Sequence, residues 1–127
     1  MRCLIVDDDE LGRMMLEVFL EEFGSCDHAE NGKIAVELYE KAADEGNPYD
    51  LVCLDNIMPV MDGPATLHCL REMDKKRKTR TRIFMISACN TPKDIEQAFF
   101  DGDCDDYVVK PFQRELISQM LKRHKLI

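Results

Sequence analysis

The sequence lacks the features that define several large classes of protein. No apolar run approaches the ~20 residues of a membrane-spanning helix, and acidic residues follow the first strand-like segment too soon for a secretory signal. We therefore expect a cytoplasmic protein with no membrane partner. There are no repeats and no low-complexity segment. The 45% hydrophobic and 33% charged residues among 127 are typical of a folded chain, so we expect one domain over residues 1–127.

An excess of positive charge and a metal-binding cysteine pattern are also missing. The formal net charge is −8, so we expect no direct nucleic-acid partner. The six cysteines contain no Cys-X-X-Cys pair, and we interpret them as reduced, buried thiols, with a redox or metal role as the alternative. The stretch 75–82 holds six of the seventeen basic residues. We interpret it as a solvated loop, with docking of an acidic partner as the alternative.

Short apolar segments alternate with segments of helical periodicity along the chain. Strands are predicted at residues 3–6, 26–30, 51–54, 83–86 and 107–109. Helices are predicted at about 11–23, 33–45, 64–73, 91–100 and 116–121. In the first helix the apolar positions with helical spacing are Leu11, Met14, Met15, Val18 and Phe19. Strict βα alternation predicts an α/β fold, with a five-stranded parallel sheet and helices on both faces.

The stretch VCLDNIMPVMDG, residues 52–63, places a carboxylate where a buried strand ends. Other strands end in the same way: the first in Asp7 and Asp8, the fourth in Ser87 and the fifth in Lys110. Ligands of open parallel sheets bind beyond the carboxyl ends of the strands. We therefore expect these side chains to gather with Asp55 in one site.

Three neighbouring carboxylates repel one another, and a hard divalent cation relieves the repulsion. Mg²⁺ suits such a site because it binds through one or two carboxylates together with water and phosphate oxygens. An aspartate carboxylate can form an acyl phosphate, while a lysine and a hydroxyl neutralise and bind the transferred group. The residues thus favour phosphoryl transfer to Asp55.

Four stretches together identify a family. LIVDDDE, LDNIMPVMDG, FMISA and DYVVKPF occur in order at residues 4–10, 54–63, 84–88 and 106–112. With them the chain resembles, over essentially its whole length, the receiver domain of two-component response regulators, of the single-domain type found in chemotaxis. The resemblance implies the flavodoxin-like strand order 2-1-3-4-5. It also implies a cis peptide bond between Lys110 and Pro111.

The resemblance implies a role for each residue of the site. Asp55 is then the phosphoacceptor and, with Asp8 and the backbone carbonyl of Ile57, a ligand of Mg²⁺ or, alternatively, Mn²⁺; Asp7 holds the ion through water. The phosphoryl group is bound, and the signal passed on, by Ser87, Lys110, the backbone of Ala88, and Tyr107.

The implied function is signal transduction in a phosphorelay. The domain is expected to be a regulatory phosphoacceptor rather than an enzyme, although it assists its own phosphorylation and dephosphorylation. A sensor histidine kinase or a phosphotransfer protein would supply the phosphoryl group. The surface of the fourth helix, fifth strand and fifth helix would then change for an unknown downstream protein. We expect a stand-alone protein.

Some residues have simpler explanations, and two depart from the family pattern. We interpret Asp9 and Asp62 as helix caps, and a purely structural Tyr107 remains an alternative. GDCDDY, residues 102–107, is one residue longer than the usual run before the fifth strand. Ile57 and Cys89 occupy positions where a polar side chain would guide hydrolytic water, so we expect no accelerated dephosphorylation.

Three other functions compete with this interpretation. An aspartyl phosphatase commonly needs a second acid at the position of Ile57, and a flavin module needs a phosphate loop where DDDE would repel phosphate. A constitutive interaction module with the same fold but without phosphorylation is the main alternative.

Overall fold

Five strands of mainly buried residues form the centre of the molecule. In a computed structural model that describes residues 1–127, they are β1 (Arg2–Val6), β2 (Ser25–Ala29), β3 (Leu51–Leu54), β4 (Arg82–Ser87) and β5 (Asp106–Val109). All neighbouring strands are parallel, and the order is β2-β1-β3-β4-β5. The predicted α/β class and strand order are confirmed. Because the order reverses between β1 and β3, a crevice is expected at the carboxyl ends of these two strands.

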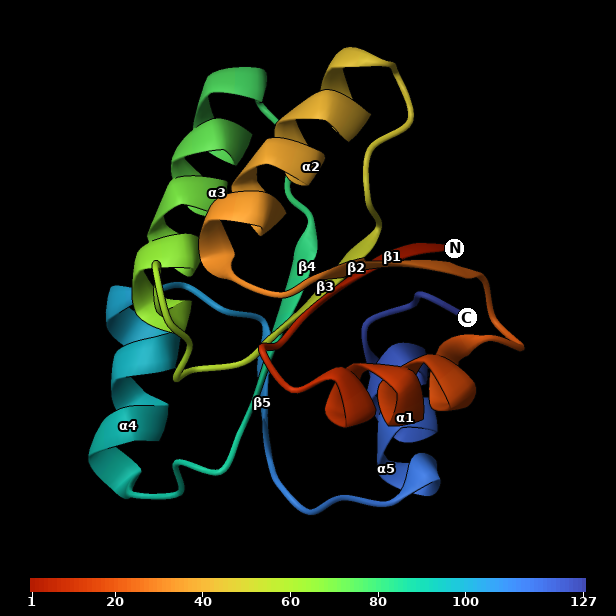
Figure 1. The fold of residues 1–127 in the computed structure, drawn as a ribbon, viewed down its shortest axis with the longest axis vertical. Coiled ribbons are helices and arrows are strands. Elements are labelled where there is room, and N and C mark those ends of the chain that lie inside the picture. Colours follow the sequence, from red (N-terminus) through yellow and green to blue (C-terminus); the bar gives the residue numbers. More distant parts are fainter.

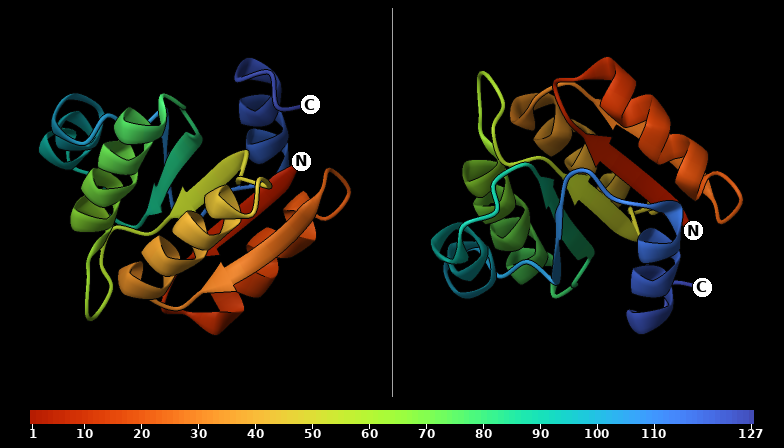
Figure 2. Two further views of the ribbon diagram at one scale, coloured as in Figure 1. Left: turned by 90° about the horizontal axis from the view of Figure 1, so that it is seen from above. Right: turned by 90° about the horizontal axis from the view of Figure 1, so that it is seen from below.

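Helices cover both faces of the sheet (Figure 1). They are α1 (Glu10–Leu20), α2 (Gly32–Asp44), α3 (Gly63–Arg77), α4 (Pro92–Glu96) with the π-helical turn η1 (Gln97–Asp101), and α5 (Arg114–Arg123). The two views of Figure 2 show α2, α3 and α4 on one face and α1 with α5 on the other. None of these helices has both the length and the apolar character needed to cross a membrane.

The alternation of side chains along the strands divides the core into two layers. Leu4 and Val6 of β1 point towards α2 and α3, where they join 13 other buried residues. Cys3 and Ile5 point towards α1 and α5, in a second cluster of 12 buried residues. Each fully buried aliphatic side chain of this kind contributes about 1.5–3 kcal/mol. The strands are thereby fixed from both sides, which gives their carboxyl ends a rigid base.

Most of the apolar residues whose spacing predicted the first helix lie on the exposed side of α1. Leu16 and Leu20 are buried, whereas the apolar residues exposed to solvent are Leu11, Met14, Met15 and Val18. The helix also ends at Leu20, three residues earlier than predicted, because the chain must turn towards β2. Gly24 lies in that turn, where a Cβ atom would be only 1.8 Å from the carbonyl oxygen of Met1. α1 therefore carries more apolar surface than the core uses.

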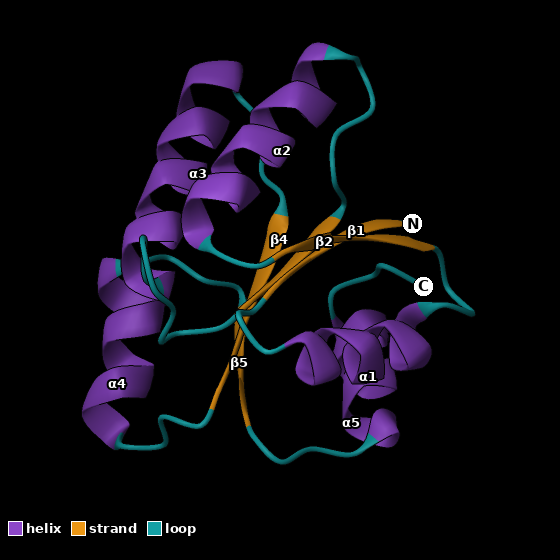
Figure 3. Ribbon diagram, in the orientation of Figure 1, coloured by secondary structure: helices purple, strands orange, loops and turns teal.

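The basic stretch 75–82 is only partly a loop. α3 continues through Arg77, and Lys78 ends it in the left-handed region with a φ of 57°. Basic side chains in the last turn interact favourably with the helix dipole, which explains the extra turn. The predicted fourth helix likewise changes form at Gln97, where five residues adopt the wider π-helical turn. Secondary structure along the chain is coloured in Figure 3.

A buried polar network connects α3 with β4 and with the segment before β5. Arg71 donates to Asp74 at 3.0 Å and to Asp105 at 2.7 Å, while Asp105 also accepts from Ile83 N at 2.8 Å and from Arg80 at 2.9 Å. Although burial opposes ionisation of Asp105, the Ile83 amide and the two arginines outweigh it and lower its pKa. The longer run GDCDDY thus supplies a carboxylate that fixes the start of β5.

Asp74 offers a test of this network. It is buried and accepts hydrogen bonds from the Tyr39 hydroxyl and the Thr81 amide as well as from Arg71. We expect Asp74→Asn to lower the free energy of unfolding in urea by about 2 kcal/mol, because a charged acceptor is replaced by a neutral one. Asp44→Asn, which breaks an exposed ion pair with Arg77, is the control and should change it by less than about 0.5 kcal/mol. Equal losses in the two variants would contradict the prediction.

Candidate functional site

Backbone hydrogen bonds fix the three charged strand ends at the sheet crevice. Asp7 N donates to Ala29 O at 3.1 Å, Asp55 N donates to Val6 O at 2.9 Å, and Lys110 N donates to Ser87 O at 2.8 Å. Each residue is thus the first beyond its strand but is still bonded to the neighbouring strand. Their side chains leave the sheet from nearly fixed positions, so the charges cannot move apart freely.

The structure brings together four of the predicted strand-end residues, the three acids and Lys110. Carboxylate oxygens of Asp7, Asp8 and Asp55 all lie within 4.8 Å of one another. The Lys110 ammonium donates to Asp7 Oδ2 at 2.7 Å and lies 3.7 Å from Asp55 Oδ1. Asp7 Oδ1 also accepts from Asp9 N at 3.0 Å. One ammonium group therefore serves two of the three carboxylates.

The surroundings of Asp55 disfavour its ionised form. Burial and the nearby charge of Asp7 raise the pKa of Asp55 to about 6, although Lys110 partly offsets them. For Lys110, burial opposes the charged form, but Asp7 and Asp55 outweigh it and raise its pKa. A cavity of about 240 Å³ lies beside these groups, and Ile5, Leu16 and Phe19 contribute to its apolar lining. Asp7, Asp55 and Lys110 also line this cavity.

The donor set fits a hard divalent cation. It consists of carboxylate oxygens, which Mg²⁺ prefers, and three acids face one lysine. Asp8 is exposed and takes part in none of the ion pairs of the molecule, so its oxygens are free for an ion. Burial and repulsion from Asp7 raise the pKa of Asp55, and a cation here would remove the repulsion. The acid cluster is thus suited to Mg²⁺ by chemistry as well as by geometry.

Ser87 and Tyr107 are connected through the backbone of Cys89. The Ser87 hydroxyl, which is buried, accepts from Cys89 N at 3.1 Å. The Tyr107 hydroxyl donates to Cys89 O at 2.8 Å, and the ring is half-buried. The backbone of Cys89 therefore links the Ser87 hydroxyl to the Tyr107 hydroxyl. Sequence reasoning missed this link, because a backbone carbonyl leaves no signal in the residue type.

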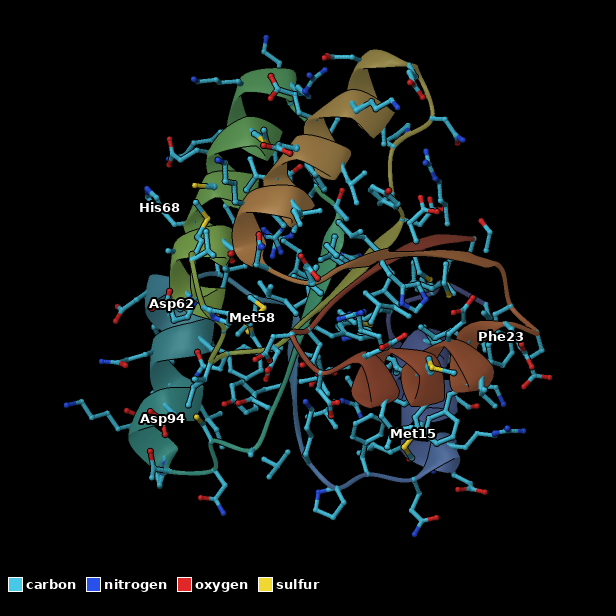
Figure 4. All side chains as sticks on the ribbon, in the orientation of Figure 1. Met15, Phe23, Met58, Asp62, His68 and Asp94 are labelled. Carbon is cyan, nitrogen blue, oxygen red and sulfur yellow. The ribbon has the colours of Figure 1, made fainter.

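The loop after β3 folds back over the end of its own strand. Gly63 N donates to Asn56 O at 2.8 Å, and a Cβ atom on Gly63 would be 2.3 Å from Asp55 O, so only glycine fits here. Asp62 caps α3 by accepting from Ala65 N, as predicted. Figure 4 marks Met58 and Asp62 in this loop. Ile57 in the same loop is 71% exposed.

Other predictions at the site have definite outcomes. Asp9 caps α1 by accepting from Leu11 N, and the Lys110–Pro111 bond is cis, so both predictions are confirmed. Ala88 is exposed in the segment after β4. The individual roles assigned to Asp7, Asp8, Asp55, Ile57, Ser87, Ala88, Tyr107 and Lys110 stay predictions.

Comparison with known proteins gives one consistent answer. The family model of the response regulator receiver domain matches residues 3–122. The two-component response regulator ORR41 of rice is 34% identical over 128 residues, which cover 98% of this chain and 94% of that protein. The solved chemotaxis protein CheY4 of Vibrio cholerae has a TM-score of 0.82 and 27% identity, covering 96% of each chain.

A second solved structure is the receiver domain of the sensor histidine kinase PA1611 from Pseudomonas aeruginosa. Its TM-score is 0.80 and its identity 26%, covering 96% of this chain and 94% of that one. It is described with a magnesium ion coordinated in its active-site cleft.

The raised pKa of Asp55 makes stability depend on pH. In the folded protein Asp55 keeps its proton up to about pH 6, whereas its ordinary pKa is 3.8. The folded state therefore binds the proton more tightly, and this contribution to stability is lost as pH rises from about 4 to 6. Without divalent cations, we expect Asp55→Asn to be more stable than the wild type by about 1–3 kcal/mol at pH 7.5. The difference should vanish below pH 4; parallel urea-unfolding stabilities across this range would contradict the prediction.

Proposed function

The chain belongs to the response regulator receiver family, and on that premise we propose that residues 1–127 act as one receiver domain whose phosphoacceptor is Asp55. The observation that carries the proposal is the meeting of Asp55 with two further carboxylates and with the Lys110 ammonium at the carboxyl ends of β1, β3 and β5. Receiver domains are regulatory phosphoacceptors of two-component signalling, are phosphorylated by histidine kinases, and bind Mg²⁺ at an acidic pocket.

Asp55 would act as the nucleophile. One of its carboxylate oxygens attacks the phosphorus atom of a phosphohistidine, the P–N bond breaks, and its electron pair stays on the imidazole nitrogen. Lys110, now paired with Asp7, turns towards the phosphoryl oxygens and stabilises their growing charge. The domain thereby assists its own phosphorylation. It also assists its own dephosphorylation, in which water attacks the phosphorus atom and phosphate leaves. It is not an enzyme for another substrate.

Four groups of the chain would hold the Mg²⁺ ion. Asp8, Asp55 and the backbone carbonyl of Ile57 would bind it directly, and Asp7 would bind it through water; Mn²⁺ would fit the same oxygen ligands. The bound ion supplies positive charge that offsets the charge of the carboxylates and of the phosphoryl group. Asp8 suits direct ligation because it is exposed and unpaired, whereas Asp7 is buried and engaged with Lys110.

Phosphorylation would reach the surface through Ser87 and Cys89. The Ser87 hydroxyl and the backbone N–H of Ala88 turn to the phosphoryl oxygens, so Ser87 weakens its bond with Cys89 N. Cys89 moves and carries with it the carbonyl to which Tyr107 donates. The surface formed by α4, β5 and α5 then changes its affinity for a downstream protein. A coupling free energy of ~1–3 kcal/mol is enough for a severalfold change.

The phosphodonor would be a sensor histidine kinase or a phosphotransfer protein. It must reach Asp55 past α1, whose exposed Leu11 and Met15 line the same cavity as Asp55. Met15 is marked on α1 in Figure 4. An apolar patch next to a reactive group is a suitable docking surface, and it explains why α1 has more apolar side chains than the core uses. We place this exchange in the cytoplasm.

Phosphate labelling tests the acceptor. With acetyl phosphate and Mg²⁺, we expect the wild type and the surface control Asp44→Asn to take up one phosphoryl group, detected as a mass increase. Asp55→Asn should show none, because an amide oxygen is too weak a nucleophile. The same failure is expected of the wild type in EDTA.

Two outcomes would count against the proposal. Labelling of Asp55→Asn at the wild-type level would show that another residue carries the phosphoryl group. No labelling of the wild type at any Mg²⁺ concentration would favour the alternative of a constitutive interaction module.

The lifetime of the phosphorylated state is a separate prediction. The Ile57 side chain is apolar, and the Cys89 side chain offers no amide or carboxylate to orient water. We expect the phosphoryl group on the purified protein in Mg²⁺ to decay over minutes or longer, measured by mass spectrometry after removal of the donor. A half-life of only a few seconds would refute the prediction.

A further inference from the structure

Two cysteines outside the acid cluster are direct neighbours across β1 and β2. Cys3 of β1 is in register with Cys26 of β2. Both side chains belong to the core layer between the sheet and α1 with α5, in which Cys3 is fully buried and Cys26 lies at the margin. β2 is the edge strand of the sheet, so Cys26 remains partly accessible to solvent.

The spacing of paired strands suits a disulfide between these residues. Adjacent strands lie about 4.8 Å apart, and disulfide-bonded residues have Cα atoms about 4.4–6.8 Å apart. Cys53 of β3 shares the same layer, but in register it is opposite Ile5 rather than Cys3. This offset of two residues places it about 8 Å from Cys3, which is too far for a bond.

The two thiols also differ in pKa and in accessibility. Such a difference is expected where one thiol attacks an oxidant and a second thiol then closes the disulfide. The neighbouring Cys3 thiol lowers the pKa of Cys26, although burial and the nearby Glu17 and Asp27 carboxylates oppose it. The interaction with Cys26, together with burial, raises the pKa of Cys3. The accessible thiol is thus the one that ionises more readily, and its buried neighbour keeps its proton.

We propose that Cys26 and Cys3 form a peroxide-reactive pair that closes to an intramolecular disulfide. The Cys26 thiolate attacks one oxygen of a hydroperoxide, the O–O bond breaks, and Cys26 becomes a sulfenic acid while water or an alcohol leaves. The sulfur of Cys3 then attacks the sulfenic sulfur; the S–O bond breaks, and the hydroxyl group leaves as water with the proton of Cys3. A dithiol reductant reduces the disulfide and restores both thiols. The proposal is independent of phosphorylation.

Peptide mapping after oxidation tests the pair. The reduced protein is treated with hydrogen peroxide in EDTA, free thiols are blocked with N-ethylmaleimide, and the chain is digested with trypsin. Cys3, Cys26 and Cys53 fall in different peptides, residues 3–13, 14–33 and 42–71. We expect 3–13 and 14–33 to become linked to each other, and dithiothreitol to separate them. Peptide 42–71, which carries both Cys53 and Cys69, is the internal control and should form no link to either of these peptides.

Three variants separate the roles of the thiols. Cys53→Ser should form the same link at the wild-type rate. Cys3→Ser should leave a sulfenic acid on Cys26 that dimedone traps, and Cys26→Ser should leave Cys3 fully reactive to maleimide after denaturation. Circular dichroism and urea unfolding show that each variant is folded. The proposal is overturned if Cys26 is still fully alkylated after peroxide, or if the linked peptides include 42–71 in place of 3–13.

Discussion

The crowding of three carboxylates at the end of a rigid sheet is the constraint on which the site depends. Asp7 and Asp55 follow strands that are buried on both faces, and their own amides are still bonded to the neighbouring strands. The acids cannot relieve their repulsion by moving apart. It must be relieved by a proton, by the Lys110 ammonium or by a metal ion. The ion pair of Lys110 and the suitability for Mg²⁺ are consequences of this one arrangement, which also adds to burial in raising the pKa of Asp55.

Much of the site could be predicted because charged residues at the ends of the strands identify it. Alternating apolar and helical segments give the βα order, and a parallel sheet brings the carboxyl ends of its strands to one edge. The sequence alone therefore predicts that four charged residues lie close together: Asp7, Asp8, Asp55 and Lys110. The same reasoning located the caps Asp9 and Asp62, whose short side chains act within one turn.

What could not be predicted depends on partners far apart in the chain. α1 has apolar residues on more than one side, and only packing against the sheet decides that Leu16 and Leu20 are buried and Met14 is not. Arg71 meets Asp105 across 34 positions of sequence, and neither residue type marks the pair. The π-helical turn at Gln97–Asp101 is likewise not marked by its residue types. Local propensity is a weak guide at these places.

The contact between Ser87, Cys89 and Tyr107 separates two properties of the domain. Both hydrogen bonds use the main chain of Cys89, through its amide and its carbonyl, and neither uses the thiol. The residue type at position 89 is therefore free to vary without breaking the connection to β5. In related chains, substitutions here could set how long the modified state lasts while the strength of coupling stays the same, so duration and amplitude could evolve independently.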